Sequence, residues 1–106
     1  MKIKKVDNLE ISKNPHKVDA RKIYDTKRGQ AVHITLDPGE SLKRHITPVD
    51  VFFYVLEGRG IVEIGDEKKE VGPDTIIESP AKIVHCWYNE SNEILRILVV
   101  KIPRPT

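Results

Sequence analysis

Short apolar segments of strand length, separated by turn residues, run through most of the chain. Pro, Gly, Asn and Asp fall between them, for instance at Asp37-Pro38-Gly39 and Gly72-Pro73-Asp74, and these residue types favour turns. Val, Ile, Tyr and Phe are common in the segments, which is the composition of β-strands. The pattern predicts strands at residues 18–24, 30–36, 51–56, 60–64, 75–78, 83–88 and 94–102.

Helical periodicity is missing from the same pattern. No stretch repeats apolar residues at helical spacing over three turns. Turn residues instead recur every ~8–12 positions, without the helix-sized gaps of a βαβ unit. The 106 residues suffice for one domain of ~100–200 residues. The sequence therefore predicts a single all-β domain over residues 1–106, built as an antiparallel sandwich or barrel.

Two of the expected strands are apolar on both faces. Residues 51–56 and 94–100 carry almost no polar side chain in either alternating set. A strand that turns one face to water should alternate apolar and polar residues, so the outer face of these strands must also be covered. The N-terminal segment or a second subunit would provide that cover. The second possibility predicts a homodimer.

Charge and cysteine content narrow the function classes. Lys plus Arg total 18 against 16 for Asp plus Glu, so the net charge is +2. These charges are dispersed, which argues against a nucleic-acid-binding face. The single cysteine, Cys86, excludes an internal disulfide. No apolar run approaches the ~20 residues of a membrane-spanning helix, and the N-terminus lacks the apolar core of a secretory signal. We therefore expect a cytoplasmic protein that binds neither membrane nor nucleic acid.

The histidines are the first candidates for chemistry. His16 lies beside Pro15 in a polar stretch and is interpreted as a surface residue. His33 lies inside an expected strand, and the sequence does not fix the face to which it points. His45 precedes the expected apolar strand that ends near Glu57, and His85 lies within the expected strand 83–88. Imidazole at such positions serves as a metal ligand or as an acid–base group near neutral pH.

The surroundings of His45 and His85 form two ordered motifs. The first, over about residues 39–58, comprises Gly39, His45, Thr47, Val51 and Gly58, and the second, over about 72–89, comprises Gly72, Pro80, Lys82, His85 and Asn89. With the run Tyr54–Gly58, this arrangement resembles the cupin superfamily. The second motif has two extra residues after its first glycine, and Lys82 stands where the family has glycine. The resemblance implies an antiparallel β-barrel of the double-stranded β-helix, jelly-roll-like type.

The departures from the family motifs concern its metal site. Typical cupins hold a divalent ion through two histidines and a glutamate of the first motif and one histidine of the second. Here His45 and His85 remain, but Thr47 and Val51 stand at the other two ligand positions. A threonine hydroxyl is a poor ligand and valine is none. The resemblance thus implies a degenerate site in which His45 and His85, with water or His33, hold a divalent Fe, Mn, Zn or Ni ion.

Strand alternation predicts which side chains share the interior with the two histidines. His45 has the parity of Thr47, Val51, Phe53 and Val55, whereas Asp50 has the opposite parity and cannot replace the missing glutamate unless a bulge shifts the register. His85 shares a face with Trp87 and Asn89, and Cys86 points away from it. The expected ligand-binding residues are Thr47, Val51, Phe53, Val55, Trp87 and Asn89. Alternatively, Trp87 is only a core residue.

Three functions remain open at this point. The preferred one is a barrel pocket that binds a small molecule between apolar walls, with few polar groups and without a required metal. The second is a metal-dependent enzyme of the oxygenase, decarboxylase or isomerase type that uses His45 and His85 as ligands. The third is a structural or interaction protein whose interior is filled by its own side chains. If the protein is an enzyme, His85 is a possible general base, because a neighbouring tryptophan would lower its pKa by desolvation.

Overall fold

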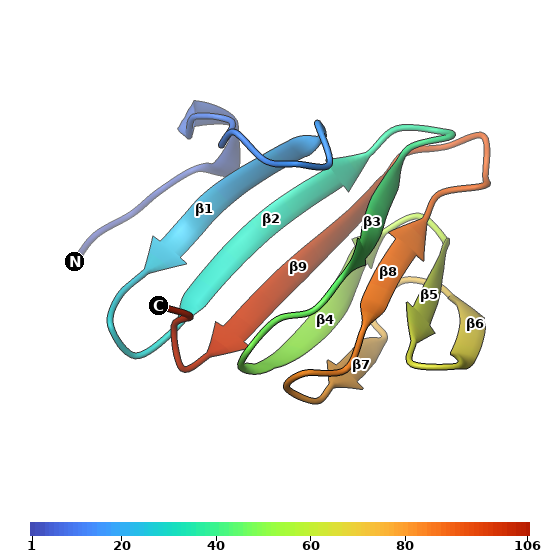
Figure 1. The fold of residues 1–106 in the computed structure, drawn as a ribbon. Coiled ribbons are helices and arrows are strands. Elements are labelled where there is room, and N and C mark those ends of the chain that lie inside the picture. Colours follow the sequence, from blue (N-terminus) through green and yellow to red (C-terminus); the bar gives the residue numbers. More distant parts are fainter.

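Two antiparallel β-sheets face each other in the computed structural model, which describes residues 1–106 (Figure 1). The five-stranded sheet has the order β1-β2-β9-β4-β7 and the four-stranded sheet the order β3-β8-β5-β6. The strands are β1 (Asp19–Asp25), β2 (Gln30–Leu36), β3 (Ser41–His45), β4 (Asp50–Glu57), β5 (Gly60–Ile64), β6 (Glu67–Val71), β7 (Ile76–Ser79), β8 (His85–Tyr88) and β9 (Leu95–Ile102). The only helical element is the 3-10 turn η1 (Val6–Asn8). No helix has the length and apolar character needed to cross a membrane.

All seven strands expected from the apolar pattern are present, with ends within two residues of the expected ones. The largest difference is at β8, which begins at His85 rather than at residue 83. Lys82 adopts a positive φ of 68°, and its N–H donates to the Thr47 carbonyl oxygen at 2.9 Å. This left-handed turn at residues 81–82 precedes the strand, and pairing with β5 begins only at His85.

The apolar pattern missed two strands, β3 and β6. In β6 four consecutive charged residues are exposed and only Val71 is half-buried. This strand lies at the edge of its sheet, where charged side chains hinder pairing with another chain. In β3 Leu42 is the only buried residue. Neither strand presents the alternation by which apolar patterning finds strands.

The two sheets enclose an apolar core but do not close into a barrel. β1 and β7 remain the edges of one sheet, and β3 and β6 those of the other. The expected all-β, antiparallel, jelly-roll-like class is confirmed, with two facing sheets instead of one closed cylinder. Between them lie fully buried side chains, of which Trp87, Phe53, Leu36, Leu95, Ile97 and Val55 are the largest apolar ones.

The outer face of the five-stranded sheet carries the second apolar side of β4 and β9. The outward residues Phe52 and Val100 are half-buried, while Ile76 and Ile102 are more than half exposed. They border a hollow of about 340 Å³ on this outer face. The N-terminal segment contacts the β1 side of this sheet, where Nη1 of Arg21 donates to the Val6 carbonyl oxygen. Cover by a second subunit therefore remains a prediction.

Candidate functional site

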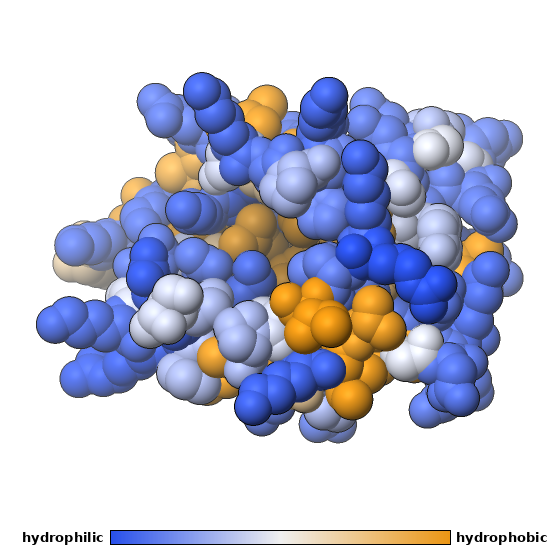
Figure 2. Space-filling view, viewed as in Figure 1, coloured by the Kyte–Doolittle hydropathy of each residue, from blue (hydrophilic) through white to orange (hydrophobic).

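A cavity of about 300 Å³ opens between the two sheets, at the end where β2 begins and β9 ends. Figure 2 shows this opening as a hollow with apolar atoms inside and hydrophilic residues around it. Its lining residues come from both sheets and from the N-terminal segment 12–16. The apolar part of the wall consists of Val18, Ala20, Val32, Ile34, Leu42, Val51, Phe53 and Val99. The interior at this end is not filled by the protein's own side chains.

His45 and His85 meet in this cavity because they are paired neighbours in adjacent strands. They are opposite each other in the β3–β8 register, and their Nε2 atoms lie 3.1 Å apart. His85 is 2% exposed, whereas His45 is half-buried at the cavity side. The ring of Phe53 stands edge-on to that of His85, with 5.2 Å between ring centroids. The structure therefore brings the two histidines together in one cavity, and their role as metal- or ligand-binding residues stays a prediction.

Hydrogen bonds assign the protons of the two rings. Nδ1 of His45 lies 2.9 Å from the Lys43 carbonyl oxygen, and since a carbonyl only accepts, this nitrogen carries a proton. In neutral His45 the Nε2 atom then accepts, so the His85 Nε2–H donates to it. Nδ1 of His85 in turn accepts from the Ser79 hydroxyl at 2.8 Å. The result is a continuous chain from Ser79 through both rings to Lys43.

The surroundings of His85 keep it neutral. Burial lowers its pKa from 6.5 to about 4, and the positive charges of His45, Lys101 and His16 act in the same direction. Nε2 also lies 3.3 Å from the Thr47 hydroxyl, which can accept a second hydrogen bond from the same Nε2–H. With a pKa of about 4 the His85 ring is a weak base, its Nδ1 lone pair is occupied by Ser79 and its Nε2 carries a proton, so the geometry does not favour the expected role of general base.

Five of the expected site residues line the cavity. They are His45, Thr47, Val51 and Phe53, from β3, the following loop and β4, together with His85 from β8. Three others, Val55, Trp87 and Asn89, are buried but lie outside the cavity. Trp87 is fully buried, with its ring 5.5 Å from that of Phe53. Strand alternation gave the correct face for these side chains but not their depth along the strand. Successive inward residues are about 7 Å apart, so one can line the cavity while the next lies in the core beyond it.

Asn89 has a structural task at the closed end of the sandwich. Its Nδ2 donates to the carbonyl oxygens of Leu36 and Glu93, at 2.9 and 2.8 Å. Its Oδ1 accepts from the backbone N–H and hydroxyl of Ser91. These bonds close the β8–β9 connection and fasten it to the end of β2, so the polar groups of Asn89 are used within the protein.

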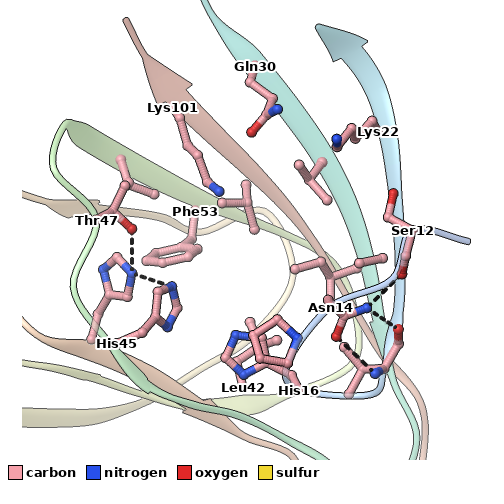
Figure 3. A pocket seen from close by; sticks show the side chains of 18 of the residues that line it. Ser12, Asn14, His16, Lys22, Gln30, Leu42, His45, Thr47, Phe53 and Lys101 are labelled. Atoms are coloured by element: carbon pink, nitrogen blue, oxygen red, sulfur yellow. Dashed lines mark hydrogen bonds between the residues drawn. The ribbon is translucent and has the colours of Figure 1, made fainter. Parts of the chain in front are cut away.

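His16, Lys101 and Gln30 are among the lining residues that sequence reasoning missed. His16 was interpreted as a surface residue, but its ring centroid lies 5.1 Å from that of His45, and its Nδ1 accepts from the Lys43 N–H at 2.8 Å. Lys101 and Gln30 line the opposite side of the cavity (Figure 3). Lys101 shares the parity of the inward Val99, a signal that the sequence contained. The approach of His16 is a long-range contact that no local pattern reveals.

The donor set does not fit the metal ion that cupin motifs imply. Thr47 and Val51 line the cavity as expected, but they supply no charged or imidazole ligand. Asp50 is turned away, with its Oδ1 accepting from the Ala81 N–H at 2.9 Å. His33 points to the outer face, where its Nε2 accepts from Arg96 Nε at 3.2 Å, so it cannot complete the sphere. No group of three His, Cys, Asp or Glu side chains is placed to hold a metal ion, and zinc sites generally have at least three protein ligands.

Comparison with known proteins gives the family. Residues 32–101 match the family model described as a cupin domain. An uncharacterised protein of Methanocaldococcus jannaschii is 32% identical, in a match that covers 80% of this chain and 82% of that protein. The crystal structure of TT1209 from Thermus thermophilus has a TM-score of 0.85 at 32% identity and covers 99% of this chain and 100% of its own.

A second similar structure is that of the polyketide cyclase RemF from Streptomyces resistomycificus. It has a TM-score of 0.84 at 25% identity, with coverage of 96% of this chain and 79% of that protein. The family match spans both motifs and most of the strands around the cavity. The chain belongs to the cupin superfamily.

Proposed function

We propose that this cupin binds a small organic molecule in the cavity between its sheets and that it does so without a resident metal ion. The observation that carries the proposal is the cavity itself, about 300 Å³ of space lined by apolar side chains and a few converging polar groups. This combination is characteristic of small-molecule sites, whose volumes begin at ~300 Å³. Apolar walls contribute affinity by removing ligand surface from water, and the polar groups orient the ligand.

The histidine pair is the polar centre of the proposed site. His45 faces the cavity, while His85 is fixed behind it by Ser79 and by the register of β3 and β8. A ligand group that displaces the His85–His45 bond meets an acceptor on His45 and a donor on His85. Such a pair can bind an amide, a hydroxyl or a carbonyl group in one orientation.

A substitution that fills the cavity tests the proposal. Ala20 lies on β1, is 6% exposed and lines the cavity, so Ala20→Leu adds a larger side chain to the ligand space. Ala31 lies on neighbouring β2 with the opposite, outward parity and provides the matched control Ala31→Leu. Ligand binding is followed by thermal shift over a panel of small organic acids, amides, sugars and phenols, because a ligand that binds the native state raises its stability with concentration.

The proposal expects at least one class of the panel to stabilise the wild type and Ala31→Leu but not Ala20→Leu. Equal stabilisation of all three proteins would place binding outside the cavity and overturn the proposal. Loss of the cooperative melting transition in Ala20→Leu is checked separately by circular dichroism, and Ala20→Val then replaces it as a smaller filling substitution.

Acid–base catalysis on the bound molecule is a second candidate, supported by the hydrogen-bond chain Ser79–His85–His45. When a ligand displaces the His85–His45 bond, Nε2 of neutral His45 can accept a proton from the ligand, which leaves an imidazolium at His45 and an anionic ligand beside it. The similar RemF protein is a polyketide cyclase and therefore an enzyme. Turnover of a ligand found in the panel, abolished in His45→Gln with binding retained, distinguishes catalysis from binding alone.

A further inference from the structure

The ionisable side chains that line the cavity are all basic. Its lining contains the lysines Lys13, Lys22 and Lys101 and the histidines His16, His45 and His85, but no aspartate or glutamate. This differs from the whole chain, whose basic and acidic residues are nearly balanced at 18 and 16. A cavity lined by cations and apolar groups raises the local concentration of small anions.

Lys101 is the most buried of the three lysines in this lining. It is half-buried in the next-to-last position of β9, paired with Gln30 of β2 on one side and Val51 of β4 on the other. Its side chain extends from β9 into the cavity toward Thr47 and Phe53 (Figure 3). An ammonium in this position has lost part of its hydration and needs a partner.

No carboxylate of the protein provides that partner. All five ion pairs of the structure involve arginine and none involves lysine. Asp25, the acid hydrogen-bonded to Gln30, already binds Arg104. Burial followed by the charge of Lys22 lowers the pKa of Lys101, and no anion acts in the opposite direction. The positive charge is therefore left uncompensated within the chain.

We propose that the ligand of this cavity is a small organic acid, whose carboxylate binds the Lys101 ammonium while its apolar body lies against Val51 and Phe53. This inference rests on the proposed function of the cavity and names its ligand class. Lysine–carboxylate hydrogen bonds are charge-assisted and stronger than neutral ones. The valine and phenylalanine side chains next to Lys101 then select acids with an apolar body over inorganic anions.

Calorimetric titration with matched probes tests the ligand class. 3-Phenylpropionate and 3-phenylpropionamide have nearly the same shape, but only the first carries a charge, and inorganic phosphate carries charge without an apolar body. The proteins are the wild type, Lys101→Met, Lys101→Gln and the control Lys69→Met, whose lysine is exposed on β6. Methionine keeps the length of the lysine side chain without its charge. Glutamine provides a second uncharged variant if methionine disturbs folding.

We expect the wild type and Lys69→Met to bind the acid about 10- to 100-fold more tightly than the amide, the ratio typical of one charge-assisted hydrogen bond. Both Lys101 variants should bind acid and amide equally. Equal binding of acid and amide by the wild type would overturn the inference and leave the proposed function standing, because the cavity would still bind. Equal binding of acid and amide is the result expected if the Lys101 ammonium extends to water at the rim of the cavity.

Two further outcomes are distinct from these. Phosphate that binds as tightly as 3-phenylpropionate would overturn the organic acid as ligand class. Absence of any binding by these probes and by the wider panel would overturn the proposed function, and this inference with it. Salt gives an independent readout, since only the charge-dependent part of the acid's affinity should weaken between low and physiological ionic strength.

Discussion

His85 should make the stability of the protein depend on pH in a way that can be isolated by one substitution. Its pKa lies at about 4 in the folded protein and at 6.5 in the unfolded chain, because burial and the nearby charges of His45, Lys101 and His16 oppose protonation. As the pH falls below 6.5, the unfolded chain binds this proton while the folded protein does not. The free energy of unfolding must therefore fall between pH 6.5 and about 4.

The size of this effect follows from the two pKa values. At about 1.4 kcal/mol per pH unit, the change from 6.5 to about 4 sets a ceiling of about 3 kcal/mol. Since the ring borders an open cavity, solvent screens part of the effect, and we expect roughly half of that ceiling. The loss should be complete near pH 4 and absent above pH 7.

Urea unfolding at intervals from pH 4.5 to 7.5 measures this dependence in the wild type and in His85→Gln. Glutamine does not titrate, so the difference between the two curves removes the contributions of His16 and His33, whose pKa values are also lowered by burial. The difference in unfolding free energy between wild type and His85→Gln should narrow by about 1–2 kcal/mol as the pH falls through this range. Parallel curves for wild type and variant would refute the claim that His85 is held neutral.

Three other predictions concern the frame of the site. Gly60→Ala should lower the free energy of unfolding by about 1–3 kcal/mol, because its Cβ would clash with Leu95 Cδ2 and lie 3.2 Å from two ring carbons of Trp87. Gly29→Ala is the control, and equal stability of the two variants would contradict this packing. In thermal unfolding, Lys82→Gly should be more stable than Lys82→Ala by up to about 1 kcal/mol, because residue 82 has a φ of 68°. A more stable Lys82→Ala would be inconsistent with that turn. Sedimentation should give the mass of a homodimer for the wild type, and Phe52→Lys on the outer apolar face should give a monomer. A one-chain mass for the wild type at micromolar concentration would contradict cover of this face by a second subunit.

Much of the fold could be predicted from local pattern, because most strands have their apolar residues in a regular order. β2 and β5 were predicted with their observed bounds. β6 could not be, because its role as a sheet edge permits four exposed charges in succession. The motif resemblance placed His45 and His85 in one site, and the β3–β8 register sets them opposite each other.

The composition of the site was less predictable, because it depends on depth and on contacts between distant segments. Alternation placed Val55 and Trp87 on the inner side, and both are fully buried there, but they fill the core beyond the cavity. His16 reaches the site through bonds between the N-terminal segment and β3, such as that from the Lys43 N–H. Lys101 could have been identified by its parity with Val99, but an inward lysine near a strand end is easily interpreted as a solvated one.

Metal content is the most direct test of the claim that this cupin cavity works without a resident ion. Protein purified without a histidine tag or chelator is analysed by elemental mass spectrometry beside His45→Ala, before and after incubation with iron, manganese, zinc and nickel. The account predicts substoichiometric metal that is the same in both proteins, because His45 and His85 are bonded to each other and no third ligand joins them. Close to one metal ion per chain, lost in His45→Ala, would contradict it.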